Sequence, residues 1–463
     1  MYSLNIISHI NYNHFKLSNE RNKMDNSNQG NNNQNTSNDG CGCGTLFCIM
    51  ILLYVFWGIF GSDVSKMLPF LEEDTEAVQE ETLITNDITY EETTEAPDPY
   101  ANKTIAEQVN EHLKNRESYF MIKKNKIMEK NGEWKRAEDI VFRTQFDIGK
   151  YCFKSISCKK NEAEGLLHVW FDYFNRQEEK SVRKKLRKEA IKAHNSIKPW
   201  EIKDDWKKLK KIHNYLVKNV TYKKNEYDQT IYGAIVKKHC VCTGYACAFA
   251  FLAKRAGIDA VIVDGYAKES SIRLQKEYDT HPDIKDLHAS SHAWNEITFN
   301  GSRYIIDVTW DDNDKKDKKG KPYIGYNYFM TSPNTVKGRM SFTEYQKYDG
   351  FSGRKLFLDY NEVPKQGKDN YFVREGIYLR KYKRKSFQSM LREQFKKGTN
   401  LLTVRIGSKS EAVASENDLI KNGNLRNVLN GIGYKNQDYR YTTPLMWNDP
   451  DCLGWAIYLY PRN

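Results

Sequence analysis

The sequence predicts an α+β fold whose globular part, residues 101–463, is held to a membrane by a single N-terminal helix. Three observations carry this prediction. Residues 242–257 place small and aromatic side chains at helical spacing. An Asn300-Gly301 pair between apolar runs predicts an antiparallel hairpin. Residues 45–61 contain no charged side chain, and the length of 463 residues indicates more than one structural unit.

Charge is distributed unevenly along the chain. The formal net charge is +12, yet residues 67–100 hold eleven acidic side chains and no Lys or Arg. Residues 1–66 carry four charges of each sign, so the net charge left to residues 101–463 is about +23. Such a surface favours an anionic neighbour, and a bacterial cell wall or an acidic lipid surface fits it best. No nucleic-acid partner is expected, because no nucleic-acid motif accompanies the charge.

The first 100 residues predict three successive segments. Residues 1–44 are polar and Asn-rich, which predicts disorder. Residues 45–61 would span about 25 Å as a helix, the short end of a membrane crossing, and predict a transmembrane anchor. A cleaved signal peptide is the alternative, although no clear small-x-small cleavage site follows. Residues 62–100 predict an extended acidic linker, because like charges repel one another.

The charges on either side of the anchor predict its orientation. Lys16, Arg21 and Lys23 precede it, whereas acidic residues dominate after Lys66. The positive-inside rule then places the N-terminus in the cytoplasm. We therefore expect a single-pass protein of the cell membrane, with residues 62–463 on the extracytoplasmic side at the cell surface.

Residues 101–200 predict an N-terminal α/β extension. A polar helix is expected over 103–130, and a heavily charged helix over 177–195. The Lys and Arg run of the second helix is typical of a solvated face rather than a binding site. Strands are expected over 140–158 and 166–174.

Residues 201–335 are predicted to form the central domain. Apolar side chains fall on one stripe of residues 201–220, which predicts a helix packed on a core. The helix that begins at Cys242 comes next. A buried strand at 260–264, a long polar loop at 268–291, a hairpin over 292–307, a charged loop at 313–322 and a strand at 323–330 complete this part.

The remaining sequence, residues 365–463, predicts a small C-terminal α+β domain. It contains Tyr371-Phe-Val-Arg, a helix near 386–397 and apolar strands at 401–406 and 453–459. Alternation of helix and strand patterns is typical of this class.

The hairpin places a histidine beside a carboxylate. If Asn300 and Gly301 are the turn, Trp294 faces Asp307 and His292 faces Thr309. His292 and Asp307 are then diagonal neighbours on one sheet face, roughly 7 Å apart at the backbone and within reach of a hydrogen bond. A carboxylate between apolar strand residues is costly to bury without a partner, and His292 is the nearest candidate.

A cysteine near this pair completes a nucleophilic site. Cys242 lies at the expected start of a helix, where the positive end of the dipole favours the thiolate. It can attack a carbonyl, while His292 takes and returns the proton and Asp307 orients the imidazole. The Cys242 backbone N–H is an expected oxyanion donor. Tyr222 or Tyr232 is a candidate second donor, and Trp294 a candidate substrate contact, although a Tyr before a turn more often serves packing.

Two other uses of the cysteines stay open. A metal site is one, because histidines and cysteines gather in this region, but the paired C-x-x-C knuckles of structural zinc sites are missing. We therefore predict no metal and no cofactor. Disulfides outside the cell are the other: Cys152 and Cys158 could pair across a short loop, whereas a Cys240–Cys242 bridge would consume the nucleophile. The residues considered for a metal are His239, Cys240, Cys242, Cys247, His281, His288 and His292.

Three blocks together resemble the bacterial transglutaminase-like superfamily: Val241-Cys-Thr-Gly-Tyr-Ala246, His292-Ala-Trp-Asn295 and Asp307-Val-Thr-Trp-Asp-Asp312. The match covers roughly residues 205–332. The resemblance implies a papain-like core in which a nucleophile helix packs on an antiparallel sheet, with the catalytic roles on Cys242, His292 and Asp307. Cys240 departs from the family, since many relatives have Gly there.

The resemblance also implies a reaction class. A thioacyl-enzyme formed from a protein or peptide amide can be resolved by water, as in a peptidase, or by a lysine amine, as in a protein-glutamine acyltransferase. A membrane-anchored extracytoplasmic cysteine enzyme is therefore expected. The alternative is a non-catalytic module of the same fold that binds anionic cell-wall polymers or protein partners.

Overall fold

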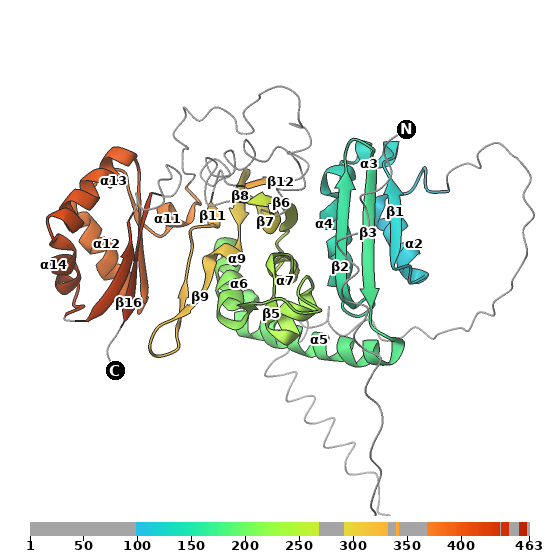
Figure 1. Ribbon diagram of the computed structural model, residues 1–463, viewed down its shortest axis with the longest axis horizontal. Coiled ribbons are helices and arrows are strands. Elements are labelled where there is room, and N and C mark those ends of the chain that lie inside the picture. The colour runs from blue at the N-terminus through green and yellow to red at the C-terminus, as the bar shows by residue number, and fades with distance from the viewer. Residues whose placement is uncertain are drawn as a thin grey trace, which may run out of the picture. The chain divides into compact units, whose positions relative to one another are not determined.

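The computed structural model describes residues 99–267, 291–331, 339–341, 368–435, 437–443 and 453–460, all within the unit that spans 67–463. These residues build three sheets of three or more strands, each with helices beside it (Figure 1). The predicted segments 1–44 and 45–61, and the linker 62–100 except its last two residues, lie outside the described residues. Among the helices of the described ranges, none is both long and apolar enough to span a bilayer.

The first sheet is antiparallel with strand order β1-β3-β2. The prediction of one helix over 103–130 is wrong, because buried Phe120 and Ile122 alternate with exposed neighbours and form β1. The prediction of a strand from 140 is also wrong up to Phe146, since Val141 and Phe142 are buried at the end of a helix instead. The elements are α2 (Ile105–Lys114), β1 (Tyr119–Lys123), α3 (Lys126–Lys130), η2 (Glu133–Arg136), α4 (Ala137–Arg143), η3 (Thr144–Phe146), β2 (Phe153–Asn161) and β3 (Leu166–Tyr173).

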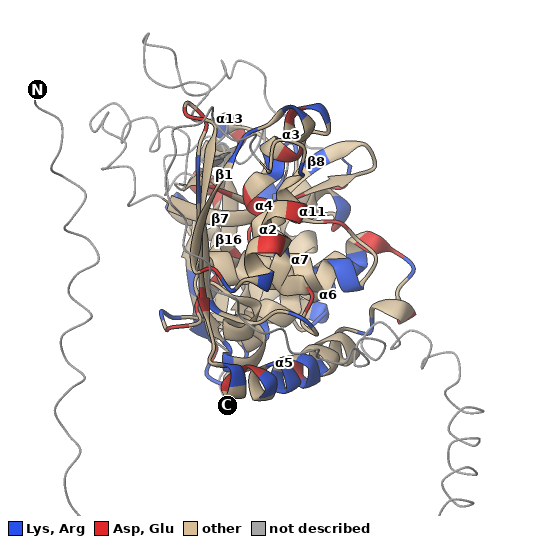
Figure 2. Cartoon of the chain, turned by 90° about the vertical axis from the view of Figure 1, so that its right-hand side faces the viewer, with Lys and Arg blue, Asp and Glu red and all other residues tan. Residues whose placement is uncertain are grey.

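Two long helices follow as predicted. In α5 (Arg176–Ile197) the apolar side chains from Val182 to Ile197 recur every three or four residues and are buried. Lys and Arg cover its outer face (Figure 2), so the charged run is a solvated face. In α6 (Asp205–Asn219) the Asp204 side chain caps the helix by accepting from the N–H groups of Trp206 and Lys207. Between these helices lies η4 (Pro199–Glu201).

The central sheet has the order β11-β8-β7-β6-β12, and each neighbouring pair is antiparallel. Helix α7 packs on β6 and β7, and α6 packs on α7, so the cysteine helix lies between a sheet and another helix (Figure 1). The bounds are β4 (Thr221–Tyr222), η5 (Gly233–Lys237), β5 (His239–Cys240), α7 (Cys242–Arg255), β6 (Val261–Ala267), β7 (Ser291–Phe299), β8 (Ser302–Ile306), α9 (Val308–Asp311), β11 (Phe329–Thr331) and β12 (Arg339–Ser341).

The hairpin between β7 and β8 has the predicted register. Asn300 and Gly301 both have positive φ, 49° and 75°, as a type I′ turn requires. Pairing runs from Phe299 opposite Ser302 to Asn295 opposite Ile306 and stops there. The predicted pairs beyond that point are therefore wrong, because the chain turns into α9 at Asp307. The predicted loop at 268–291 lies outside the described residues except at Ser291, which begins β7.

The charged segment that follows is a small hairpin rather than a loop. Strands β9 (Asp312–Lys316) and β10 (Pro322–Ile324) pair antiparallel. The expected strand over 323–330 is divided into β10 and β11 by residues 325–328, with a turn at Asn327 and Tyr328. A Cβ at Gly325 would lie 2.7 Å from the Asp311 carbonyl oxygen, so the backbones can approach this closely only with glycine.

The last sheet has the order β13-β14-β16-β15, and Figure 1 shows its helices on one face. Its core includes Phe387, Leu402 and Trp455. Helix α11 instead packs in the central core through Tyr371 and Phe372. The elements are α11 (Tyr371–Arg374), β13 (Tyr378–Leu379), α12 (Arg384–Lys396), β14 (Leu401–Ile406), α13 (Lys409–Glu416), η7 (Asn417–Lys421), α14 (Asn424–Gly431), β15 (Asp438–Thr442) and β16 (Gly454–Tyr460).

Candidate active site

The start of α7 positions the candidate nucleophile. Cys242 is the first residue of the helix and is partly buried, whereas every side chain from Gly244 to Ala253 is buried. Val241 caps the helix without a side-chain hydrogen bond. The N–H groups of the first turn have no acceptor within the helix, so they are free to bind an oxygen that carries negative charge. The thiol thus lies at a rigid helix end beside oriented donors.

The predicted pairing of His292 with Asp307 is present. The imidazole Nε2 lies 2.8 Å from Asp307 Oδ2, and the side chains are 8% and 1% exposed. A carboxylate only accepts, so Nε2 carries the hydrogen and donates. Cys242 is close enough to the His292 ring to help raise the pKa of the imidazole. Since Nε2 is occupied by Asp307, Nδ1 is the ring nitrogen left for the sulfur.

Asp307 has a second role in the backbone. Its other oxygen, Oδ1, accepts from the Trp310 N–H at 3.2 Å and caps α9. The carboxylate is therefore held from two sides, which fixes the His292 ring relative to the start of α7. Helix α9 also contacts α7 directly.

The environment of His292 favours its charged form. Burial lowers the pKa of the imidazole, but the Asp307 carboxylate and then Cys242 outweigh burial and raise the pKa to about 9. His292 therefore holds a proton on both nitrogens near neutral pH. An imidazolium beside a thiol is the arrangement that stabilises a thiolate nucleophile.

The aromatic candidates are placed differently from one another. Trp294 is 2% exposed and stacks beside His292 with ring centroids 6.2 Å apart. Tyr222 is 45% exposed and pairs through its backbone with Cys240; burial and then Cys242 raise the pKa of its hydroxyl. Tyr232 packs in the core against Phe174. The structure thus places Trp294 and Tyr222 near Cys242 and His292, while Tyr232 serves packing.

A family comparison covers this same part of the chain. The model described as the transglutaminase-like superfamily matches residues 199–307, which contain Cys242 and His292 and end at Asp307. Residues 199–307 are therefore similar to the transglutaminase-like superfamily. The match spans the same part of the chain as the three sequence blocks, and it confirms the resemblance drawn from the sequence.

Solved structures similar to the chain are distant. One is a candidate cysteine protease of Cytophaga hutchinsonii, with 16% identity over 34% of this chain and 61% of its own, and a TM-score of 0.21. A protein named TGase has 14% identity over 38% of this chain and 50% of its own (TM-score 0.20), and a candidate protease of Parabacteroides distasonis has 11% over 33% and 36% (TM-score 0.19). The chain spans less than two thirds of the length of each. No curated protein matches the chain significantly.

Several polar residues that position the site were not singled out from the sequence. Asn295 donates to the Ala246 carbonyl at 3.0 Å and so ties β7 to α7. Tyr245 donates to Asp312 Oδ2 at 2.6 Å and ties α7 to β9. Asn295 is a polar residue in a strand and is 1% exposed. A buried polar group needs a hydrogen-bond partner, and this argument, which was applied to Asp307, would also have identified Asn295.

The cysteines of the described residues carry free thiols. Cys152 and Cys158 form no disulfide, so that suggested pairing is not realised. Cys158 lies within β2, where it pairs with Val169, whereas Cys152 precedes the first residue of that strand. Burial raises the pKa of Cys152 to about 12 and those of Cys158, Cys240 and Cys247 well above their ordinary value. These four are therefore poor nucleophiles.

A metal site finds no support in the described ranges. Within them, no three His, Cys, Asp or Glu side chains are grouped so that they could hold an ion. His281 and His288 lie outside the described residues.

The raised pKa of His292 predicts a pH-dependent stability. The pKa is raised from 6.5 to about 9 on folding, so its stabilising effect is complete below 6.5 and is lost as the pH rises through 9. The full loss corresponds to about 3 kcal/mol at most. Denaturant unfolding at successive pH values should show this decline, and Asp307→Asn should make it shallower. A decline of equal slope in Asp307→Asn would contradict the assignment to His292.

Proposed function

We propose that the protein is a cysteine enzyme that acts on protein or peptide amide bonds through a thioacyl intermediate on Cys242. One observation carries the proposal: a partly buried thiol at the start of a buried helix lies beside a histidine, and a buried carboxylate 2.8 Å away orients that histidine. A buried structural histidine would need neither the thiol nor the helix end beside it. The arrangement supplies nucleophile, acid–base and orienting group.

The chemistry follows from these positions. The Cys242 sulfur attacks the amide carbonyl carbon, and a C–S bond forms while the carbonyl oxygen becomes an oxyanion. N–H groups at the start of α7 stabilise that oxyanion. His292 then gives its Nδ1 proton to the amide nitrogen, the C–N bond breaks and the amine or ammonia leaves.

The thioacyl-enzyme is resolved by a second nucleophile. Water or a primary amine loses a proton to His292 as it attacks the thioester carbon, and the C–S bond breaks. The Cys242 thiolate returns with the imidazolium beside it. Water completes a hydrolysis and an amine completes an acyl transfer, so the same residues serve both reactions.

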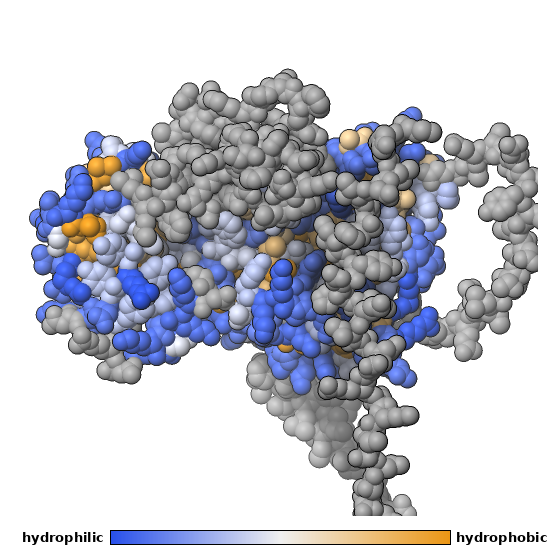
Figure 3. Space-filling model, in the orientation of Figure 1, coloured by the Kyte–Doolittle hydropathy of each residue, from blue (hydrophilic) through white to orange (hydrophobic). Residues whose placement is uncertain are grey.

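We also propose a location outside the cell membrane. The uncharged segment 45–61 and the charge change across it support a single-pass anchor with the basic part on the extracytoplasmic side. The face in Figure 3 is mostly hydrophilic over the described residues, which suits a tethered domain surrounded by water.

One experiment separates the two reactions. The full chain, purified in detergent, is incubated with a peptide library with and without an excess of a small primary amine, and the products are weighed by mass spectrometry. Chain cleavage identifies a peptidase, and loss of ammonia with gain of the amine identifies an acyltransferase. Cys242→Ala should abolish either change. A library left unmodified by the parent, or modified equally by Cys242→Ala, would contradict the proposal.

The charge of the chain favours one second candidate. The net charge of about +23 over residues 101–463 suits a module that holds an anionic cell-wall polymer or protein partner without catalysis. Binding of purified cell walls that survives in Cys242→Ala and disappears in high salt, together with an inert peptide library, would favour this candidate over the enzyme.

A further inference from the structure

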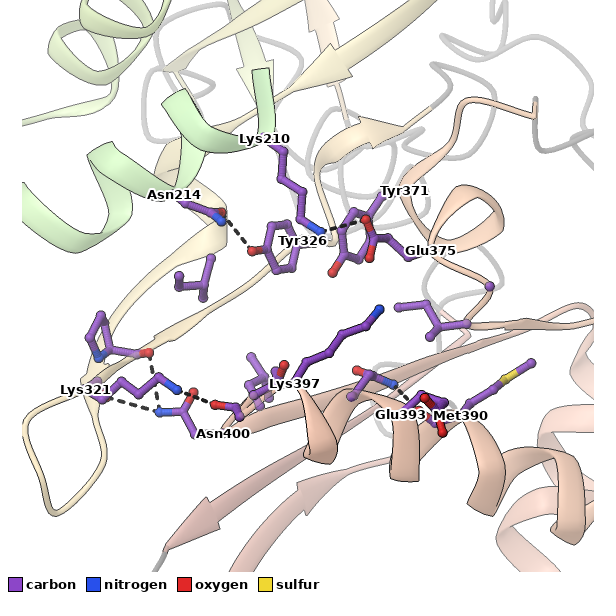
Figure 4. A pocket seen from close by; sticks show the side chains of 18 of the residues that line it. Lys210, Asn214, Lys321, Tyr326, Tyr371, Glu375, Met390, Glu393, Lys397 and Asn400 are labelled. Atoms are coloured by element: carbon purple, nitrogen blue, oxygen red, sulfur yellow. Dashed lines mark hydrogen bonds and ion pairs between the residues drawn. The ribbon is translucent and has the colours of Figure 1, made fainter. Parts of the chain in front are cut away.

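A cavity lies away from Cys242, His292 and Asp307, none of which lines it. It has a volume of about 730 Å³, within the range of small-molecule and peptide sites. Side chains of α6 and α12 line it, together with residues 321–326, 371–377 and 397–401 (Figure 4). It is therefore built by three parts of the chain that are far apart in sequence.

Four lysines and two glutamates line this pocket, so its formal charge is positive. Lys210 is already matched: its Nζ lies 2.7 Å from Glu375 Oε1 and above the Tyr326 and Tyr371 rings, 5.4 and 5.2 Å from their centroids. The lysines are Lys210, Lys218, Lys321 and Lys397, and the acids are Glu375 and Glu393.

Three of the lysines form no ion pair with a carboxylate of the described residues. Lys218 and Lys397 are exposed and form no ion pair with any residue of the described ranges. Lys321 Nζ donates to the Gly398 carbonyl instead of a carboxylate. Lys397 is close enough to Lys210 to oppose its charge. The unmatched cations thus make the pocket attractive to negative charge.

The pocket also offers a flat apolar surface and neutral hydrogen-bonding groups. Tyr326 and Tyr371 stack at 4.2 Å, and the Tyr326 hydroxyl donates to Asn214 at 2.8 Å, which fixes the pair. Figure 4 shows the two rings beside Lys210 and Glu375, across the cavity from Lys397. Ser386 and Ser389 of α12 add hydroxyl groups. A ligand here can meet rings, cations, hydroxyls and carboxylates together.

We propose that this pocket binds an acidic peptide segment. Lys218 and Lys397 would take its side-chain carboxylates, the tyrosine pair would take an apolar side chain, and Glu393 and the serines would accept from its backbone N–H groups. A polyphosphate offers only acceptors, so it has no donor for Glu393, whereas a peptide backbone supplies N–H groups. The lining also holds no Arg, the residue best suited to bind phosphate with two parallel hydrogen bonds.

An acidic peptide segment for this pocket could come from two sources. Residues 67–98 of the chain itself contain eleven acidic residues and no Lys or Arg. A segment of the same chain has a high effective concentration, so even a weak intramolecular contact would be populated. The other source is an acidic segment of a separate protein. Both are peptides of the same charge, and a binding experiment can tell them apart.

The test measures binding of fluorescein-labelled hexaglutamate to the full chain by anisotropy. The double variant Lys218→Glu/Lys397→Glu should bind at least about 10-fold more weakly, since two attractive charges become repulsive. The control Lys123→Glu/Lys130→Glu changes the net charge equally, at exposed residues of β1 and α3, and should bind within about 2-fold of the parent. Melting temperatures check that both variants fold.

Further arms decide the source and the ligand class. Replacing the eleven acidic residues of 67–98 by Asn and Gln should tighten hexaglutamate binding if the chain's own segment occupies the pocket, and leave it unchanged if the ligand is a separate protein. Equal binding by the pocket and control variants would overturn the site. Displacement by inorganic polyphosphate as efficient as by unlabelled hexaglutamate would overturn the peptide assignment. Cys242→Ala should not alter this binding, so its outcome is independent of the proposed catalysis.

Discussion

Asp307→Asn should lower turnover by about 10³- to 10⁴-fold while the protein still folds. Asn keeps the volume of Asp and an oxygen that can cap α9 by accepting from the Trp310 N–H, 3.2 Å away in the parent. It removes the negative charge 2.8 Å from His292 Nε2, so the pKa of His292 falls from about 9 and the imidazole loses its orienting partner. Turnover is measured as kcat/KM on the peptide identified by the library experiment, with circular dichroism to confirm folding.

Asp311→Asn is the matched control. Asp311 lies four residues further on, is 2% exposed and also contacts a histidine, with its Oδ2 3.1 Å from His213 Nε2. This pair joins α9 to α6 and does not touch His292. The control should therefore lower the free energy of unfolding but keep kcat/KM of the folded protein within a few-fold. Equal losses of turnover in the two variants would show that burial of a carboxylate, rather than its contact with His292, matters.

Gly244→Ala should destabilise the protein by about 3 kcal/mol, near the upper end for overpacking a buried site. A Cβ at this position would lie 2.4 Å from the Asp228 carbonyl oxygen and 2.5 Å from Cys240 Cβ. Neither atom is the end of a flexible side chain, so the start of α7 must shift. Denaturant unfolding measures the loss.

Thr243→Ala serves as the comparison for Gly244→Ala. Thr243 is the neighbouring residue of the same helix turn and is only partly buried. It should change the free energy of unfolding by less than about 1 kcal/mol. Similar losses of stability in both variants would mean that the close backbone approach is not the reason that position 244 requires glycine.

Local rules account for the parts of the fold that the sequence predicted correctly. The Asn300-Gly301 turn fixes the register of β7 and β8 because a two-residue turn leaves one pairing. The α6 stripe predicted its buried face for a similar reason, since helix geometry alone brings residues three and four apart together. The turn does not determine where the strands end. The predicted pairing past Ile306 was wrong because Asp307 caps a helix that begins at the next residue.

Contacts between distant segments explain the errors. Phe120 and Ile122 form a strand only because β3, about 47 residues later, pairs with it, as Phe120 opposite Val169 and Ile122 opposite Leu167 show. Tyr232 was considered for the site because it precedes Cys242 in sequence, but its direction is set by packing on Phe174.

The contacts of the candidate site also fall into local ones, which the sequence predicts, and contacts between distant segments, which it does not. His292 and Asp307 were found from hairpin geometry, because 15 residues separate them on one supersecondary unit. The contact between Cys242 and His292 joins two separate elements, so only the family motifs indicated it. The His213 contact with Asp311 spans 98 residues and had no sequence signal of that kind.

The rate at which each thiol reacts with iodoacetamide tests the central claim most directly. At pH 7, site-resolved mass spectrometry should find that Cys242 is alkylated at least about 10-fold faster than the buried thiols Cys152, Cys158, Cys240 and Cys247, and that His292→Ala removes this advantage. A fluorescent thiol-reactive probe should give the same result, with little labelling of Cys242→Ala. Labelling of Cys242→Ala as strong as that of the parent, or an unchanged Cys242 rate in His292→Ala, would contradict the assignment of Cys242 as the nucleophile.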